Sequence, residues 1–236
     1  MLRTRVGAAV AAVTAGALLA LPGTSAQAIG PTPVLDLQLN EAAGASTAFD
    51  SSGKGRHGAI GSHVAMNGSY AAFDYHSPSA GVPYGYDHLI KVPDAADGSL
   101  DPESGNFSVE LRYRTKHSFG NVLQKGQATT YGGQVKFQQP RGKMSCMFKT
   151  PQGTATAGSG TTPLNDGNWH TVRCDRTPTS VTMYVDGVKT GRSSKPTGTL
   201  NNNKPWVLGG KDSCNGTTVT CDYFAGDIDY VKLTKG

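Results

Sequence analysis

Short runs in which apolar and polar residues alternate follow one another from residue 34 to the C-terminus. Gly, Pro, Asn and Asp separate the runs, and no window carries a sustained period of about 3.6 residues, so we predict strands rather than helices. Twelve strands are predicted, at residues 34–39, 57–61, 70–73, 89–92, 107–115, 121–125, 133–138, 143–149, 169–175, 180–185, 205–209 and 226–233. Because so many antiparallel strands in one open sheet would curl or split, the pattern predicts an all-β, two-sheet antiparallel β-sandwich of jelly-roll type.

The segment DGNWHTVRCDRTPTSVTMYVDG, residues 166–187, shows this alternation on both sides of RTPTS, which predicts a β-hairpin. An Asp-Gly pair stands near each end, and such pairs favour tight turns. Trp169 and His170 suggest chemistry at first sight, but no second histidine or acid stands beside His170 at the spacing of a metal or catalytic pair. We interpret both residues as folding machinery that packs or hydrogen-bonds at the start of a strand.

The N-terminus has a different character. MLRTR carries two arginines, residues 6–21 form an uncharged run rich in Ala, Val and Leu, and AQA ends at Ala28. This plan predicts a secretory signal peptide, residues 1–28, and the rival reading of a membrane anchor is disfavoured because the run is short and Pro22 follows it. We expect a secreted, extracellular product in which residues 29–236 form one domain without membrane insertion.

Charge excludes one class of partner. The chain has 22 Lys and Arg against 17 Asp and Glu, and two of the arginines lie in the predicted signal peptide. Basic and acidic residues are mixed along the chain, and no three consecutive residues are basic, so we expect no nucleic-acid partner. We also expect a monomer.

The four cysteines, Cys146, Cys174, Cys214 and Cys221, make two disulfides the default in an exported chain. Three pairings are possible, and local geometry favours one of them. Cys214 and Cys221 bracket the short loop NGTTVT, whereas Cys146 and Cys174 each lie in a predicted strand. We predict Cys146–Cys174 between neighbouring strands and Cys214–Cys221 across a hairpin loop; a zinc site is disfavoured because no Cys-x-x-Cys pair occurs.

The hairpin at residues 166–187 resembles the core hairpin of laminin G-like domains of the concanavalin A-like lectin/glucanase superfamily, in which a D-G-x-W-H-x-V strand precedes a Y-V-D-G strand. Three further stretches are similar in the same order: LQLNEAAGASTAFDSSGKGRHGAI at 37–60, NVLQKG at 121–126 and FAGDIDYVKL at 224–233. Together they span nearly all of residues 33–235. The chain is thus identified as a laminin G-like domain protein of the secreted bacterial type, which implies a concanavalin A-like sandwich.

Two stretches depart from the family pattern. The strand FSVELRYR carries Arg112 where the family usually has Trp, and a commonly short turn is replaced by DYHSPSAGVPYGYDH, residues 74–88. This loop gathers Tyr75, Tyr84 and Tyr86 with two histidines. Because sugars bind to aromatic faces and a few fixed polar groups, we predict ligand binding by these tyrosines with Arg112 nearby. The alternative is that the tyrosines only pack the loop against the sandwich.

The resemblance also implies one structural Ca²⁺ at the rim of the sandwich. Calcium takes carboxylate and carbonyl oxygens. The candidates are Asp50 in FDSSGKGRHG and Asp229 on the last strand, with backbone carbonyls from Ser52 or Gly55. The alternative needs no metal: Asp50 caps an Asx-type turn and Asp229 bonds the same loop directly.

The carboxylates do not match those of the enzymes of this fold. Glucanases carry acids at alternate positions of one strand, because a general acid and a nucleophile flank the sugar about 5 Å apart. Here Glu110 is followed on its face by Arg112 and Arg114, and the Gln-x-His motif of the alginate-lyase relatives is absent. The sequence leaves enzymatic activity open and favours a non-catalytic, lectin-like module that binds a glycan. The alternative is an extracellular protein-interaction or adhesion domain, and a glycosidase or lyase ranks third.

Overall fold

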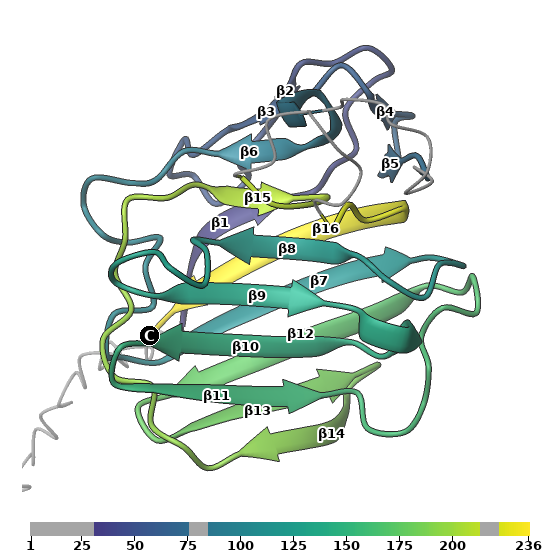
Figure 1. Cartoon of the computed structure of the whole chain (residues 1–236). Coiled ribbons are helices and arrows are strands. Elements are labelled where there is room, and N and C mark those ends of the chain that lie inside the picture. The colour runs from purple at the N-terminus through teal and green to yellow at the C-terminus, as the bar shows by residue number, and fades with distance from the viewer. Residues whose placement is uncertain (1–30, 76–84, 213–221) are drawn as a thin grey trace, which may run out of the picture.

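The computed structural model describes residues 31–75, 85–212 and 222–236, which form two antiparallel sheets that face each other (Figure 1). Sheet A has the order β14 (Val188–Ser193), β13 (Ser180–Val185), β12 (His170–Thr177), β7 (Phe107–Arg114), β16 (Gly226–Lys235), β5 (Ala71–Phe73), β4 (Val64–Met66), and β1 (Thr32–Leu37) also pairs with β16. Sheet B has the order β11 (Gly153–Gly158), β10 (Ser145–Thr150), β9 (Gln134–Gln138), β8 (Asn121–Lys125), β15 (Trp206–Leu208), β6 (Ile90–Val92), β3 (Gly58–Ile60), β2 (Thr47–Ala48). The predicted two-sheet sandwich is confirmed.

Helical structure is confined to two short 3-10 turns in these ranges, η1 (Gly85–His88) and η2 (Pro140–Gly142). No helix of the described residues is long and apolar enough to span a bilayer.

Each of the twelve predicted strands has a counterpart, and four further strands were not predicted, namely β2, β4, β11 and β14. In β11, buried Ala155 and Ala157 alternate with exposed Thr154 and Thr156, so the period of two is present but its apolar side chains are small. The edge strand β14 has no buried residue, and it therefore has no apolar face for a sequence pattern to report.

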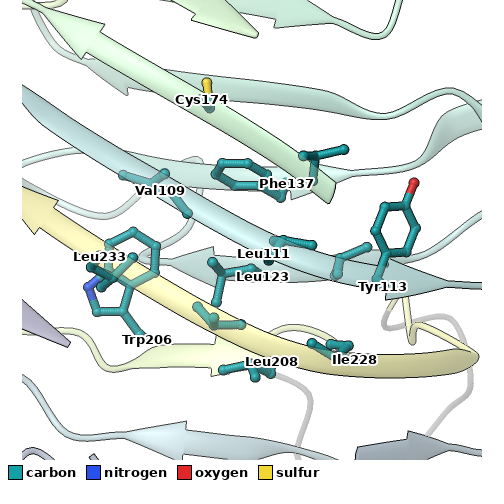
Figure 2. Packing of buried hydrophobic residues seen from close by; sticks show 14 of the residues in the cluster. Val109, Leu111, Tyr113, Leu123, Phe137, Cys174, Trp206, Leu208, Ile228 and Leu233 are labelled. Atoms are coloured by element: carbon teal, nitrogen blue, oxygen red, sulfur yellow. The ribbon is translucent and has the colours of Figure 1, made fainter. Parts of the chain in front are cut away.

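The core lies between the sheets (Figure 2). Every second residue of β7 points inward and is buried, namely Phe107, Val109, Leu111 and Tyr113. Trp206 of β15 is fully buried, its ring lies parallel to that of Phe107 with centroids 6.2 Å apart, and its Nε1 donates to the Leu100 carbonyl at 2.9 Å. The same alternation turns Ser108, Glu110, Arg112 and Arg114 to the outer face of sheet A.

Cys146 on β10 and Cys174 on β12 form a disulfide, which confirms the first predicted pair. The expectation that this bond joins neighbouring strands was wrong, because β10 belongs to sheet B and β12 to sheet A. Both cysteines occupy inward positions, where the two sheets meet, and their Cα atoms lie 6.5 Å apart. The second predicted pair, Cys214–Cys221, and the predicted signal peptide, residues 1–28, lie outside the described residues.

Candidate ligand-binding site

Two arginines of β7 lie beside two aspartates of β16 on the outer face of sheet A. Arg114 stands opposite Asp227 in the antiparallel register, and Arg112 stands opposite Tyr230. A β-bulge just before Tyr230 leaves both Asp229 and Tyr230 partly exposed. Such a bulge re-aims side chains, and here it brings Asp229 against Arg112.

Each arginine is held by one aspartate. Arg112 Nη1 lies 2.6 Å from Asp229 Oδ2, and Arg114 Nε lies 2.6 Å from Asp227 Oδ2. The hydrogen bond with Asp227 raises the pKa of Arg114, whose guanidinium is already protonated at all ordinary pH values. Ion pairs with this exposure contribute at most about 1 kcal/mol to stability. Their main effect is to fix the orientation of the two guanidinium planes.

Trp169 immediately precedes β12 and lies over both guanidinium groups. Its ring centroid is 5.0 Å from Cζ of Arg112 and 4.6 Å from Cζ of Arg114. Tyr70 meets the indole edge-on at 5.6 Å and lies 5.0 Å from Cζ of Arg114. The indole is half-buried, so Trp169 packs as expected of folding machinery, but it packs on the outer surface rather than in the core. We call these residues and the two aspartates the Trp169 cluster: Tyr70, Arg112, Arg114, Trp169, Asp227 and Asp229.

A depression of about 530 Å³ adjoins the cluster where β7 ends, and we call it the Tyr75 pocket. Its lining includes Tyr75, Lys116 and His117, and it shares Arg114 and Asp227 with the Trp169 cluster. Tyr75 is 58% exposed, and its ring is stacked on that of His117 with centroids 4.2 Å apart. Flat aromatic surface beside guanidinium, ammonium and carboxylate groups suits a ligand that has both C–H faces and hydroxyl groups.

A family model described as the concanavalin A-like lectin/glucanases superfamily matches residues 85–236, which is more than half of the chain. The chain belongs to this superfamily. The resemblance found in the sequence is thereby confirmed at the level of the superfamily. No curated protein matches the sequence of this superfamily member.

Solved structures share its fold at low sequence identity. Domains LG4-5 of the mouse laminin α1 chain match with a TM-score of 0.52 and 20% identity, over 70% of this chain and 46% of that chain. The binding domain of Paraclostridial Mosquitocidal Protein 1 matches with a TM-score of 0.56 and 12% identity, over 86% of this chain and 48% of that chain. The ligand binding domain of botulinum neurotoxin serotype D, in complex with N-acetylneuraminic acid, matches with a TM-score of 0.58 and 12% identity, over 86% of this chain and 46% of that chain. This superfamily member therefore spans about half the length of the chains that it matches, and the likeness shows the fold alone.

The structure places two of the four predicted ligand-binding residues, Tyr75 and Arg112, close to Arg114. Tyr75 lines the Tyr75 pocket together with Arg114, and Arg112 shares the Trp169 ring with it. Tyr84 lies outside the described residues, and Tyr86 lies in η1 with its side chain outside them. Ligand binding by the four residues stays a prediction.

Most residues of the site were not predicted as ligand-binding residues, and Tyr70, Arg114 and Trp169 are the most important of them. The strand pattern placed Arg114 on the same face as Arg112, and this shared face was the signal that could have added Arg114 to the predicted ligand-binding residues. Tyr70 and Trp169 lie about 100 residues apart in the sequence. Tyr70 immediately precedes β5, which pairs with β16, and Trp169 immediately precedes β12, which pairs with β7, so the two residues meet because β7 and β16 are neighbours.

The predicted calcium ligand Asp50 is held by its own loop and by β1. Its Oδ1 accepts the backbone N–H groups of Asp36 at 3.0 Å and of Ser52 at 2.9 Å. Its Oδ2 accepts the N–H of Arg56 at 2.9 Å and the hydroxyl of Ser52 at 2.8 Å. Burial alone would raise the pKa of Asp50, but these hydrogen bonds outweigh it and lower that pKa.

These contacts match the Asx-type turn that was the metal-free alternative for Asp50. The other predicted carboxylate, Asp229, pairs with Arg112 instead of the loop that contains Ser52 and Gly55. In the part of the chain that the structure describes, no group of three or more His, Cys, Asp or Glu could hold a metal ion. The oxygens of Asp50, surrounded by donors, are a poor fit to calcium, and calcium binding stays a prediction.

His170 links the two Asp-Gly turns of the hairpin. Its Nδ1 lies 2.8 Å from Asp186 Oδ2, and its Nε2 lies 3.1 Å from Asp166 Oδ1. Burial alone would lower the pKa of His170, but the two carboxylates outweigh it and raise that pKa. Hydrogen bonds from Asn168, with a smaller contribution from His170, lower the pKa of Asp166 to about 2. His170 thus hydrogen-bonds at the start of a strand, as interpreted from the sequence, but its partners are two acids that the sequence spacing did not reveal.

The His170 contacts predict a pH-dependent contribution to stability. Because the folded-state pKa of His170 exceeds the unfolded value of about 6.5, the contribution is fully present below about pH 6.5 and is lost as pH rises through the folded pKa. We expect the difference in unfolding free energy between wild type and His170→Gln to shrink between pH 6 and pH 9, as measured by urea unfolding. A difference that is constant over this range contradicts the account of His170.

Proposed function

We propose that this chain is a secreted, extracellular, lectin-like module that binds a glycan through the Trp169 cluster and the adjoining Tyr75 pocket. The observation that carries the proposal is the partly exposed Trp169 ring, set over two arginines that aspartates hold in place, beside a pocket with a more exposed ring, Tyr75. Secretion by means of residues 1–28 is part of the proposal.

The geometry supplies what sugar recognition requires. Aromatic faces pack against the C–H surface of a pyranose, and fixed polar groups bond its hydroxyls. Arg112 and Arg114 each have five N–H donors and give only some of them to the aspartates, so donors are left for a ligand. Because the ion pairs and the indole already fix these guanidiniums, ligand binding costs little side-chain entropy.

The fold of known binding domains supports the proposal. The botulinum neurotoxin serotype D domain was solved in complex with N-acetylneuraminic acid, and the mosquitocidal protein domain is described as a binding domain. That ligand is a property of the neurotoxin domain. The comparison supports the proposal only in showing that domains of this fold serve as binding domains in other proteins.

Trp169→Ala tests the proposal. We expect glycan affinity to fall at least about tenfold, because the variant removes the largest aromatic surface of the site. The cost in stability is smaller than for a buried tryptophan, roughly 1–2 kcal/mol, because the lost contacts are two surface cation–π pairs and one edge-on ring contact. A glycan array of the wild-type protein, with and without a calcium chelator, identifies the ligand, and titration calorimetry gives the change in affinity.

Tyr184→Ala is the matched control. Tyr184 packs against Arg173, with its ring centroid 4.4 Å from Cζ, on the same outer face but outside the Trp169 cluster. This variant therefore removes an aromatic–arginine pair of the same kind and is expected to keep its affinity. Equal affinity of the Trp169→Ala variant and wild type, with both variants folded, contradicts the proposal.

A protein partner is the second candidate. A groove of about 580 Å³ lies on the outer face of sheet A near Phe107, at the opposite end of β7 from the Trp169 cluster. Pro31 and Pro33 give it apolar surface, and Glu110, Arg173 and Lys232 line it with charges of both signs. This mixture suits an extended peptide better than a sugar. Absence of binding to every glycan on the array favours this second candidate.

A further inference from the structure

Tyr131 is the most exposed large apolar or aromatic side chain in the described residues. It stands in the β8–β9 loop, residues 126–133, and is 94% exposed. An aromatic ring loses hydrophobic stabilisation when it faces water, so this ring adds little to folding. The loop around it is, in contrast, held by many contacts.

Hydrogen bonds fix the loop from both sides. Within it, the N–H of Gln127 donates to Thr130 Oγ1 at 2.7 Å, and the N–H of Thr130 donates to the Gln127 carbonyl at 3.0 Å. From outside it, the N–H of Asn201 donates to the Gly132 carbonyl at 3.0 Å. Lys149 Nζ donates to the Ala128 carbonyl at 3.2 Å.

The two glycines after Tyr131 allow the loop to approach its neighbours closely. Gly132 and Gly133 have φ values of 84° and 105°, which favour glycine. A Cβ on Gly132 would lie 1.7 Å from the Asn201 carbonyl oxygen, and one on Gly133 would lie 2.4 Å from that of Lys149. The backbone is thus locked against two other segments, and Tyr131 is displayed on a rigid support.

A pocket of about 310 Å³ lies beside the ring. Apart from Tyr131, its lining combines the amide groups of Gln127 and Gln134 and the hydroxyl groups of Thr129, Thr130 and Thr150 with apolar surface that includes Ala128 and Pro151. One charged residue, Lys149, also lines it, and its ammonium is bonded to the Ala128 carbonyl. Neutral donors and acceptors around one flat ring match the hydroxyl groups and C–H face of an uncharged sugar.

We propose that Tyr131 and this pocket form a second carbohydrate site, which takes one pyranose ring of a neutral polysaccharide. The inference rests on the proposed function only for the expectation that the ligand is a carbohydrate, since it uses none of the residues of the Trp169 cluster. The ring of Tyr131 packs against the C–H face of the sugar, while Gln127 and Thr129 face its hydroxyl groups.

The two sites lie at opposite ends of the sandwich. Figure 1 shows the β8–β9 loop at the end where β7 begins, whereas the Trp169 cluster lies where β7 ends. The eight residues of β7 rise about 3.3 Å each, which separates the sites by more than about 20 Å. A long chain can contact both sites, and the effective concentration at the second site then strengthens its retention.

Affinity electrophoresis through gels that contain laminarin, xylan, galactomannan or hyaluronan tests this site. We expect Tyr131→Ala to weaken retardation about threefold to tenfold in at least one of the neutral gels. Tyr131→Phe keeps the ring and should retain most of the binding. Because the side chain is almost fully exposed, neither variant should change the melting temperature.

The outcomes separate this inference from the proposed function. If Trp169→Ala abolishes retardation and Tyr131→Ala migrates like wild type in every gel, the second site is excluded and the proposed function stands. If Tyr131→Ala loses binding and Trp169→Ala does not, the second site stands and the proposed location of the first is wrong. If none of the four polysaccharides retards the wild-type protein, the second site is rejected.

Discussion

Arg176→Met is expected to lower the free energy of unfolding by about 3–5 kcal/mol. Arg176 is 1% exposed on the inward face of β12, and no carboxylate pairs with it among the described residues. Its Nε donates to Thr197 Oγ1 at 3.1 Å, its Nη1 donates to the carbonyls of Pro102 at 3.2 Å and Gly105 at 2.5 Å, and its Nη2 donates to the Gly198 carbonyl. Methionine fills a similar volume but donates no hydrogen bond, so three backbone carbonyls and the Thr197 hydroxyl lose their partner.

Urea unfolding at neutral pH measures this loss. Arg192→Met on the exposed edge strand β14 removes the same charge and should change stability by no more than about 0.5 kcal/mol. Arg176→Lys keeps the charge, but one ammonium group cannot reach acceptors in several directions, so an intermediate loss is expected. A loss of unfolding free energy below about 1 kcal/mol for Arg176→Met shows that the guanidinium does not hold the segments 102–105 and 197–198 together.

Replacing both Cys146 and Cys174 by alanine is expected to cost about 3–4 kcal/mol. The disulfide closes a sequence separation of 28 residues, and in the chain-entropy model such a loop restricts the unfolded chain by about this amount. Both residues are fully buried between the sheets, so the bond also ties β10 to β12 across the core.

The comparison is made by urea unfolding with and without reductant. Reductant should destabilise wild type to nearly the level of the double variant, whereas the double variant should change much less. Any bond between Cys214 and Cys221 is open to reduction in both proteins, so its effect cancels in the comparison. Equal stability of wild type and the double variant in oxidising buffer contradicts the assigned role of the bond.

The sequence predicted the strands well because the core imposes a period of two. Phe107, Val109, Leu111 and Tyr113 alternate with polar residues, and such alternation is visible without a structure. It becomes weak where inward residues are small, as in β11, or where a strand lies at an exposed edge, as in β14. The Cys146–Cys174 pair was predicted, but which sheet each strand joins depends on long-range pairing that a local pattern does not report.

The site was predicted only in part for the same reason. Tyr75 and Arg112 stood out by local composition and by departure from the family pattern, and both lie at or next to the site. That Trp169 lies over two arginines depends on the register of β12 and β16 against β7. Tyr131 could have been suspected from the two glycines that follow it, but its exposure depends on how the loop packs against Asn201 and Lys149.

The central claim is that a glycan binds at the Trp169 cluster, and the two tryptophans of the chain allow a direct test. Trp169 is partly exposed in the cluster, whereas Trp206 is fully buried with its indole N–H bonded to the Leu100 carbonyl. Two indole N–H signals are therefore expected in a ¹⁵N-labelled protein, and Trp169→Phe assigns them. During titration with the glycan that binds best on the array, the account predicts that the Trp169 signal shifts in a saturable way while the Trp206 signal stays in place. Saturable binding that leaves the Trp169 signal unmoved contradicts it.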